Sequence, residues 1–411
     1  MIFLNPRAVR GPYPEPLCAI LNIRRAQECR HWLSPWSMLN PSPTPVWSLP
    51  GAARRLGLGS IRVKDESARS SLGSFKALGA PAALLRLALE RVPEAQEHPT
   101  EVLSGRYAAA LRNFVVASAT DGNHGRGLAA AASSAGCRSV IVLHAQVSAE
   151  REAAIAALGA EVIRIAGNYD DSVREAARLA GEHGWQVVSD TSYEGYEDIP
   201  RDVMQGYGVM VDELLDGRAD GSPCPFTHVI VQGGVGGLAA GVASYFWERF
   251  ADRRPAFVVV EPEQADCLLQ SAHAGRPSRA GGSVDSVMAG LACGETSPLA
   301  WRFLEPSVDA FMTVTDAQAV DAMRALARPS DGDIPVLSGE SGAAGFAALL
   351  ALRDAPERHS LGLDDKARVL LLNTEGATAP LLYESLAGIA PAAVLQAQAG
   401  WLAARNASPG R

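Results

Sequence analysis

The chain has 411 residues, of which 47% are hydrophobic, and this length allows two α/β domains with sizeable cores. Its formal net charge of -8 argues against nucleic acid or an anionic membrane as a partner. No signal peptide is expected from the N-terminal residues. The sequence has no apolar run near the ~20 residues of a membrane span and no CxxC spacing among its six cysteines. It therefore predicts a cytoplasmic enzyme without a metal site.

The first part of the chain predicts few regular elements. Residues 1–50 are rich in proline and are expected to form an arm that is irregular or contains only short elements. Residues 56–63 predict a strand. The Ala/Leu-rich stretch from 76 to about 92 predicts a helix, which the polar run 93–100 ends as a surface loop.

From Asn113 onward, strands and helices alternate, which is typical of α/β proteins with parallel sheets and right-handed crossovers. The first series has predicted strands at 114–117, 139–143, 161–165 and 186–189, with helices at 125–135, 148–159 and 170–182. The second has strands at 228–231, 257–260 and 369–372.

The predicted fold is therefore two doubly wound α/β domains with an active site in the cleft between them. We expect residues 1–80 and 210–411 to form the larger, discontinuous domain and residues 81–209 the smaller one.

Lys76 follows Gly73-Ser74-Phe75 at a tight strand-to-helix junction. A partly desolvated lysine there is expected to have a lowered pKa and to act as a nucleophile toward an aldehyde. A lone lysine is far more often a solvated surface charge. Two glycine-containing segments later in the chain favour the functional interpretation.

The later of these segments is a glycine loop that follows an apolar strand and opens a helix. Backbone N–H groups at such a position cradle a phosphate. The loop consists of Gly233, Gly234, Val235, Gly236 and Gly237. With Glu261 it also fits a dinucleotide-binding pattern, but that alternative leaves Lys76 unexplained.

The other segment is Thr120-Asp121-Gly122-Asn123-His124-Gly125, which also lies between a strand and a helix. Its backbone amides and the Thr120 hydroxyl suit a carboxylate, and Asn123 suits a ring oxygen. The alternative is a helix-capping loop without a ligand. A lysine, an asparagine-bearing turn and a glycine loop, in this order, are the parts that hold pyridoxal phosphate.

Thr374 follows the last predicted strand. A neutral hydroxyl that faces the pyridine nitrogen leaves this nitrogen largely unprotonated, which favours elimination or replacement over transamination. An ordinary turn after a core strand is the alternative.

From Lys64 to Gly376 these motifs resemble the fold-type II pyridoxal-phosphate enzymes. The resemblance implies that Lys76 forms the Schiff base with the cofactor and that the glycine loop holds the phosphate. It also implies that the Asn123 loop binds the substrate carboxylate and the ring oxygen.

Within that group the chain resembles the diaminopropionate ammonia-lyase family. Asp121 stands where dehydratases usually carry a small residue, and Asp190 adds a second carboxylate. The resemblance implies α,β-elimination of D- and L-2,3-diaminopropionate to pyruvate and two ammonia, by a homodimer.

The substrate's cationic side-chain amine requires negative charge in its pocket, which Asp121 and Asp190 provide. The resemblance implies that Lys76 is the base for the L isomer and that Asp190, paired with Asp121, serves the D isomer. Thr120, Gly122 and Glu340 complete the predicted substrate site. Taken singly, the aspartates also fit a helix cap and a turn residue.

Two other interpretations stay open. One is a dehydratase of the serine/threonine type or a β-replacement enzyme of the same fold. The other is a nucleotide-binding or catalytically silent sensor protein. Cys267 and Cys293 are expected to be thiols, with a labile disulfide as the less favoured alternative.

Overall fold

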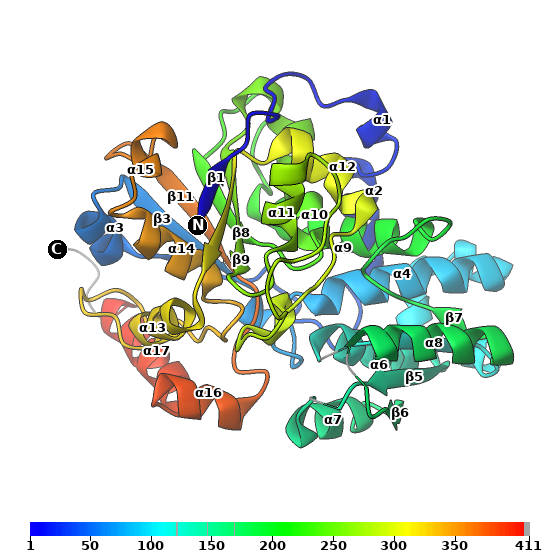
Figure 1. The fold of residues 1–411 in the computed structure, drawn as a ribbon. Coiled ribbons are helices and arrows are strands. Elements are labelled where there is room, and N and C mark those ends of the chain that lie inside the picture. Colours follow the sequence, from blue (N-terminus) through cyan, green and yellow to red (C-terminus); the bar gives the residue numbers. More distant parts are fainter. Residues whose placement is uncertain (121, 146, 168, 407–411) are drawn as a thin grey trace.

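The computed structural model describes residues 1–120, 122–145, 147–167 and 169–406. Two separate β-sheets organise these residues, each surrounded by helices (Figure 1). This arrangement confirms the predicted α/β class with two sheets.

The larger sheet has seven strands in the order β1-β10-β9-β8-β11-β3-β2. Its five central strands run parallel, whereas β1 and β2 pair antiparallel at the two edges. The strands are β1 (Ile2–Leu4), β2 (Val46–Ser48), β3 (Ser60–Asp65), β8 (His228–Gln232), β9 (Ala256–Pro262), β10 (Ala310–Val314) and β11 (Arg368–Asn373).

The smaller sheet has four parallel strands in the order β6-β5-β4-β7. They are β4 (Val115–Ala119), β5 (Arg138–Leu143), β6 (Glu161–Arg164) and β7 (Gln186–Val187).

Helices connect the strands and cover the sheets (Figure 1). Those of the first half are α1 (Glu15–Cys18), α2 (Ile23–Leu33), α3 (Pro50–Leu56), α4 (Lys76–Arg91), α5 (Ala108–Leu111), α6 (Asn123–Ala135), α7 (Ala149–Ala156), α8 (Tyr169–His183) and α9 (Asp198–Leu214). Those of the second half are α10 (Gly237–Phe250), α11 (Cys267–Ala274), α12 (Pro298–Ser307), α13 (Asp316–Ala327), α14 (Ala344–Leu352), α15 (Glu357–Ser360), α16 (Pro380–Ala387) and α17 (Pro391–Asn406).

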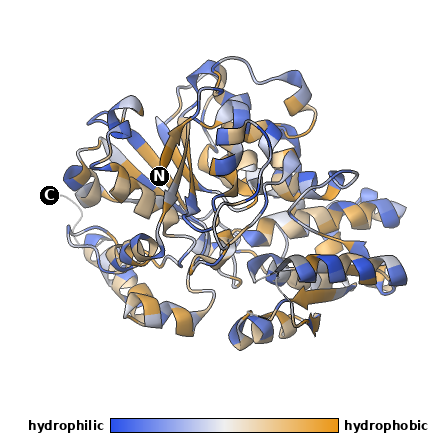
Figure 2. Ribbon diagram, viewed as in Figure 1, coloured by the Kyte–Doolittle hydropathy of each residue, from blue (hydrophilic) through white to orange (hydrophobic). Residues whose placement is uncertain are grey.

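One hydrophobic core reaches across both sheets. It contains Ile141 of the small sheet and Val229 of the large sheet, joined through buried side chains of α4, α9 and α10. In Figure 2 the strands are mostly hydrophobic, whereas the outer helix α8 is largely hydrophilic. Strands covered on both faces become continuous apolar runs, which is why β8 and β11 could be recognised in the sequence.

The N-terminal arm is more regular than predicted. Residues 1–50 contain the three-residue edge strands β1 and β2, in keeping with an arm of short elements, but also the 11-residue helix α2, which was not expected. Asn22 caps α2 by accepting a hydrogen bond from the backbone N–H of Arg25 at 2.9 Å. The polar run after α4 forms two 3₁₀ helices, Pro93–Gln96 and Pro99–Ser104.

Helix α4, which begins at Lys76, is packed closely against its neighbours by glycines. A Cβ added at Gly127 of α6 would lie 2.5 Å from the carbonyl oxygen of Lys76. A Cβ at Gly206 of α9 would lie equally close to the carbonyl oxygen of Leu78. Because only glycine permits these approaches, the backbone at Lys76 is held by contacts with two other helices.

Among the described residues, no single helix is long and apolar enough to cross a membrane, although the bent pair Pro380–Ala387 and Pro391–Arg405 passes by length and composition. The described residues contain no group of three or more His, Cys, Asp or Glu side chains that could hold a metal ion. The domain boundaries at residues 80 and 209 stay a prediction.

Candidate active site

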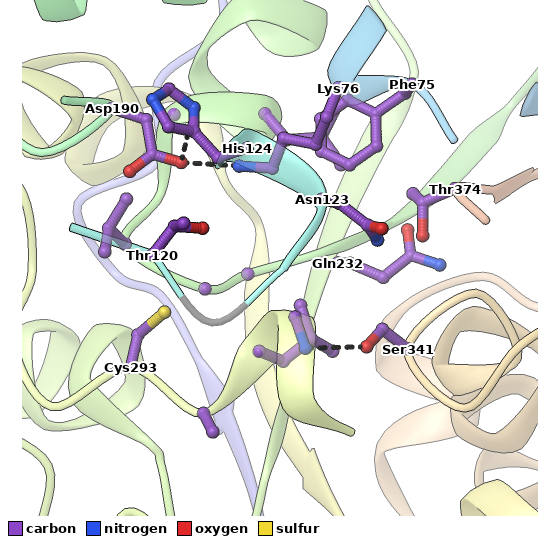
Figure 3. Close-up of a pocket in the computed structure, with 18 of the residues that line it drawn as sticks. Phe75, Lys76, Thr120, Asn123, His124, Asp190, Gln232, Cys293, Ser341 and Thr374 are labelled. Carbon is purple, nitrogen blue, oxygen red and sulfur yellow. Dashed lines mark hydrogen bonds and ion pairs between the residues drawn. The ribbon is translucent and has the colours of Figure 1, made fainter. Parts of the chain in front are cut away.

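A cavity lies where the carboxyl ends of strands from both sheets meet, and it collects most of the predicted site residues (Figure 3). The predicted residues that line it are Lys76, Thr120, Asn123, Asp190, Gly233, Gly234, Val235, Gly237 and Thr374. They come from five separate segments of the chain. The motifs recognised one by one in the sequence therefore share one site.

Lys76 is the first residue of α4, and the end of β11 holds the segment before it. The backbone N–H of Phe75 donates to the carbonyl oxygen of Thr374 at 3.0 Å, and that of Gly376 donates to Gly73 at 2.9 Å. Gly73 has a φ of 69°, which favours glycine at this turn. The strand that carries Thr374 thus also positions Lys76.

The chain has three lysines, and Lys76 is the one that lines the cavity. The Lys64 ammonium is buried between the Thr44 carbonyl and the Glu213 carboxylate, at 3.0 Å from each. Lys366 is exposed on the surface. Lys76 is therefore the lysine available to a ligand in this cavity.

The Lys76 ammonium donates a hydrogen bond to Asp190 Oδ2 at 2.5 Å. Figure 3 shows Lys76 and His124 both directed at this carboxylate; His124 Nδ1 lies 3.8 Å from Asp190 Oδ2. His124 Nε2 lies 2.9 Å from the carbonyl oxygen of Val188, which fixes the imidazole ring. These three residues form an acid–base cluster at one wall of the cavity.

The predicted fall of the Lys76 pKa was wrong. Burial lowers the pKa of Lys76, but the negative charge of Asp190 and its hydrogen bond outweigh burial and raise it. For Asp190, burial raises the pKa, but the charges of Lys76 and His124 lower it by more, so the net shift is downward and the carboxylate stays ionised. The sequence could not reveal this because Asp190 is 114 residues away.

The Asn123 segment wraps around the Thr120 hydroxyl. Thr120 Oγ1 accepts hydrogen bonds from the backbone N–H groups of Gly122 at 3.1 Å and Gly125 at 3.3 Å. Asn123 begins α6, and its side-chain amide donates to Glu375 Oε2. Asp121 lies outside the described residues.

The glycine loop has the geometry of a phosphate cradle. It connects β8 to the 14-residue helix α10, and Gly234 and Gly236 have φ values of 59° and 103°. A Cβ at Gly234 would project toward Gly290 O and Cys293 Sγ, at 3.6 and 3.7 Å, in the cavity wall. The loop thus leaves its backbone open to an anion at a helix N-terminus.

Behind this loop lies the buried carboxylate of Glu261. A Cβ at Gly233 would lie 2.7 Å from Glu261 Cγ, so glycine is required there. Glu261 accepts hydrogen bonds from the backbone N–H groups of Leu268 and Leu269 at 2.8 Å each. Burial raises the pKa of Glu261 to about 8, although these hydrogen bonds lower it.

The cavity fits pyridoxal phosphate on the evidence of its own residues. It combines a lysine, a glycine loop at a helix N-terminus and the hydroxyl of Thr374. Gln232 also lines it, and Gln232 Oε1 is buried without a hydrogen-bond partner among the described residues. A polar ligand in the cavity would satisfy such an atom.

The remaining predicted residues lie elsewhere. A Cβ at Gly236 would meet the Leu304 side chain at 2.9 Å, away from the cavity. Gly122 packs near Arg151. Glu340 is buried and pairs with Arg151 at 2.9 Å; burial and the charge of Glu375 raise its pKa to about 7. Its role in substrate binding stays a prediction.

Cys267 and Cys293 are thiols in the structure. The Cys267 thiol is buried and donates to the Gly234 carbonyl at 3.5 Å, whereas Cys293 lines the cavity.

Sequence reasoning missed four polar or aromatic residues that line the cavity: Tyr207, Gln232, Ser341 and Glu375. Gln232 and Glu375 each stand directly beside a predicted residue, so their positions at strand ends were the available signal. Tyr207 lies within α9, where no local pattern distinguishes it from a core residue.

Residues 38–375 match the family described as pyridoxal-phosphate dependent enzyme. The chain is 40% identical to the diaminopropionate ammonia-lyase of Escherichia coli K12 over 342 residues, 82% of this chain and 85% of the relative. It is 39% identical to that of Salmonella typhimurium LT2, over 84% and 88% of the two chains.

The fold agrees with these sequence matches. The crystal structure of the E. coli diaminopropionate ammonia lyase in complex with an aminoacrylate-PLP azomethine reaction intermediate has a TM-score of 0.82 and 35% identity, covering 94% of this chain and 96% of that one. This similarity confirms the expected fold-type II architecture. The chain belongs to the pyridoxal-phosphate dependent enzyme family, where it groups with the diaminopropionate ammonia-lyases, and its cofactor is pyridoxal phosphate.

Proposed function

We propose that this chain is an ammonia-lyase that converts D- and L-2,3-diaminopropionate to pyruvate and two ammonia by α,β-elimination. The observation that carries the proposal is the 2.5 Å contact between Lys76 and Asp190 beside the glycine loop. It joins a lysine suited to hold the cofactor to an ionised carboxylate suited to act as a base. The E. coli and Salmonella relatives carry this activity in their names.

Bound pyridoxal phosphate supplies an electron sink for the pair of electrons left when the substrate loses its Cα proton. Lys76 holds the cofactor and then removes the proton of the L isomer. Asp190, together with Asp121, removes the proton of the D isomer. Asp190 is an ionised carboxylate, the form that can accept a proton.

The charge of the cavity favours a cationic side chain. Among its described lining residues are two carboxylates, Asp190 and Glu375, against the single ammonium of Lys76. When Lys76 is joined to the cofactor, a diaminopropionate ammonium replaces one positive charge near these carboxylates. The neutral hydroxyl of serine or threonine does not supply a positive charge. Diaminopropionate is therefore favoured over the substrates of a dehydratase.

The proposal is tested with loaded enzyme and four substrates. Pyruvate formation is measured from D- and L-diaminopropionate, L-serine and L-threonine. We expect both diaminopropionate isomers to react with a higher kcat/KM than either hydroxy amino acid. Rapid turnover of threonine without reaction of D-diaminopropionate would instead indicate a dehydratase.

The cofactor site is tested separately by borohydride fixation and peptide mapping. Because the chain has three lysines, the label has three possible positions, and we expect it on Lys76. Lys76→Ala should abolish fixation and activity, whereas the exposed Lys366→Ala is the matched control and should retain both. A label on Lys64 or Lys366 would refute the assignment.

We further infer that the enzyme acts in the cytoplasm as a homodimer with an amino-acid substrate and without nucleic-acid or membrane partners. The similarity to fold-type II enzymes supports this assembly. Light scattering of the loaded enzyme during size exclusion should give twice the chain mass of 43.2 kDa. A monomer would contradict it.

A further inference from the structure

Glu375 lies where three segments of the active site meet. Its backbone forms a β-bridge with Ser74, two residues before Lys76. Its carbonyl oxygen accepts a hydrogen bond from the backbone N–H of Gly339 at 2.9 Å. The backbone of Glu375 is therefore fixed, and its buried side chain can reach only nearby partners.

The side chain of Glu375 accepts hydrogen bonds at both oxygens. The backbone N–H of Ser341 donates to Oε1 at 3.1 Å, and the side-chain amide of Asn123 donates to Oε2. Asn123 is the first residue of α6, whose positive N-terminal end stabilises a nearby carboxylate. A carboxylate accepts and never donates, so the amide nitrogen of Asn123 has to face Glu375.

The hydrogen bond from the backbone N–H of Ser341 fixes which oxygen of Glu375 faces Ser341 and which faces Asn123. A backbone N–H cannot reverse, so a glutamine at position 375 would have to turn its oxygen toward Ser341 and its nitrogen toward Asn123. Asn123 would then rotate its amide to present oxygen instead of nitrogen. Glu375 thus determines which side of Asn123 carries the nitrogen and which carries the oxygen.

We propose that Glu375 is a positioning residue that sets the orientation of the Asn123 amide toward the cofactor. This inference rests on the proposed function and on the contact between Asn123 and the ring oxygen of pyridoxal phosphate that the sequence predicts. Acting through Asn123, Glu375 controls the hydrogen bond to that oxygen. It therefore controls cofactor affinity and the balance between the visible and near-ultraviolet absorption bands of the loaded enzyme.

A double-mutant cycle tests the proposal. The dissociation constant for pyridoxal phosphate and the ratio of the two bands are measured for the wild type, Glu375→Gln, Asn123→Ala and the double variant. Loss of the Glu375 charge changes cofactor binding whether residue 123 is asparagine or alanine. Reversal of the Asn123 amide changes cofactor binding only when Asn123 is present. The charges of Arg126 and Glu340 near Glu375 persist in all four proteins.

We expect Glu375→Gln to weaken cofactor binding about tenfold more when residue 123 is asparagine than when it is alanine. A tenfold difference is in the range of one hydrogen bond to a charged group. The band ratio should show the same non-additivity. Equal effects in both backgrounds would overturn the proposal. If Glu375→Gln does not fold, Glu375→Asp, which withdraws the carboxylate by one methylene, replaces it with the same criterion.

Asp333→Asn is the matched control, because Asp333 is a buried carboxylate that accepts the backbone N–H groups of Gly51 and Ala52 at the start of α3. Its effect on cofactor binding should be additive with Asn123→Ala; non-additivity there would overturn the specific role of Glu375. If the wild type forms no borohydride-fixable adduct, the proposed function itself fails. If the adduct forms on Lys76 and the cycle is additive, only this inference fails.

Discussion

Gly127→Ala tests how tightly the helices hold Lys76. The added Cβ would lie 2.5 Å from the Lys76 carbonyl oxygen, about 0.9 Å short of an ordinary contact at 3.4 Å. Because the neighbouring atom is backbone, α4 or α6 has to move. Such overpacking costs about 1–3 kcal/mol, partly offset by the ~1 kcal/mol gain in helix propensity. A displacement near 1 Å at a catalytic group costs on the order of 100-fold in rate.

We therefore expect Gly127→Ala to lower kcat on diaminopropionate by ten- to a hundredfold while changing the free energy of unfolding by no more than about 2 kcal/mol. Steady-state kinetics and urea unfolding of the loaded enzyme measure the two quantities. Gly181→Ala is the control, because Gly181 lies in α8 and its added Cβ would meet nothing within 4 Å apart from its chain neighbours and the backbone of its own helix. If Gly127→Ala retains full kcat and gains stability as Gly181→Ala does, the close-packing argument is refuted.

Two other substitutions test individual carboxylates. Asp190→Asn should lower kcat/KM for D-diaminopropionate by about 100-fold or more, and less for the L isomer, because Lys76 remains as the base for L; equal losses would contradict that division of roles. Glu261→Gln tests the raised pKa of the Glu261 carboxyl group, which is about 8 in the folded protein and near 4.3 in the unfolded chain. The free energy of unfolding of the wild type should fall as pH rises through this window. The thermal midpoints of the variant and the wild type are compared between pH 5 and 8.5. The midpoint of the variant should rise relative to that of the wild type as the pH increases. A difference in midpoint that does not change with pH would be inconsistent with the raised pKa of Glu261.

The parallel strands were predictable because burial on both faces leaves a strong sequence signal. β8 and β11 are runs of apolar residues, and each ends at a polar or glycine motif of the site. The glycine loop, the Asn123 turn and Lys76 were predictable for a different reason. Local backbone requirements, such as the φ of 59° at Gly234, restrict the residue types at these positions.

The missed elements carry weaker signals. β1 and β2 have three residues each, too few for a periodic pattern, and their pairing depends on distant partners. Helix α2 buries Ala26, Cys29 and Leu33, a helical spacing obscured by the prolines around it. Electrostatics was least predictable: the opposite pKa shifts of Lys76 and Asp190 follow from a contact made only in the folded chain.

The place of β11 in the large sheet has a consequence for synthesis of the protein. This strand is the last one in the described part of the chain, yet it lies between β8 and β3, and it pairs Val369 with both His228 and Ile61. A ribosome therefore releases most of the chain before the two halves of the sheet can join. Until then β8 and β3 each present an open edge to other chains. Since Thr374 and Glu375 follow β11 directly, the nascent protein gains its complete cofactor site only when this late strand closes the sheet.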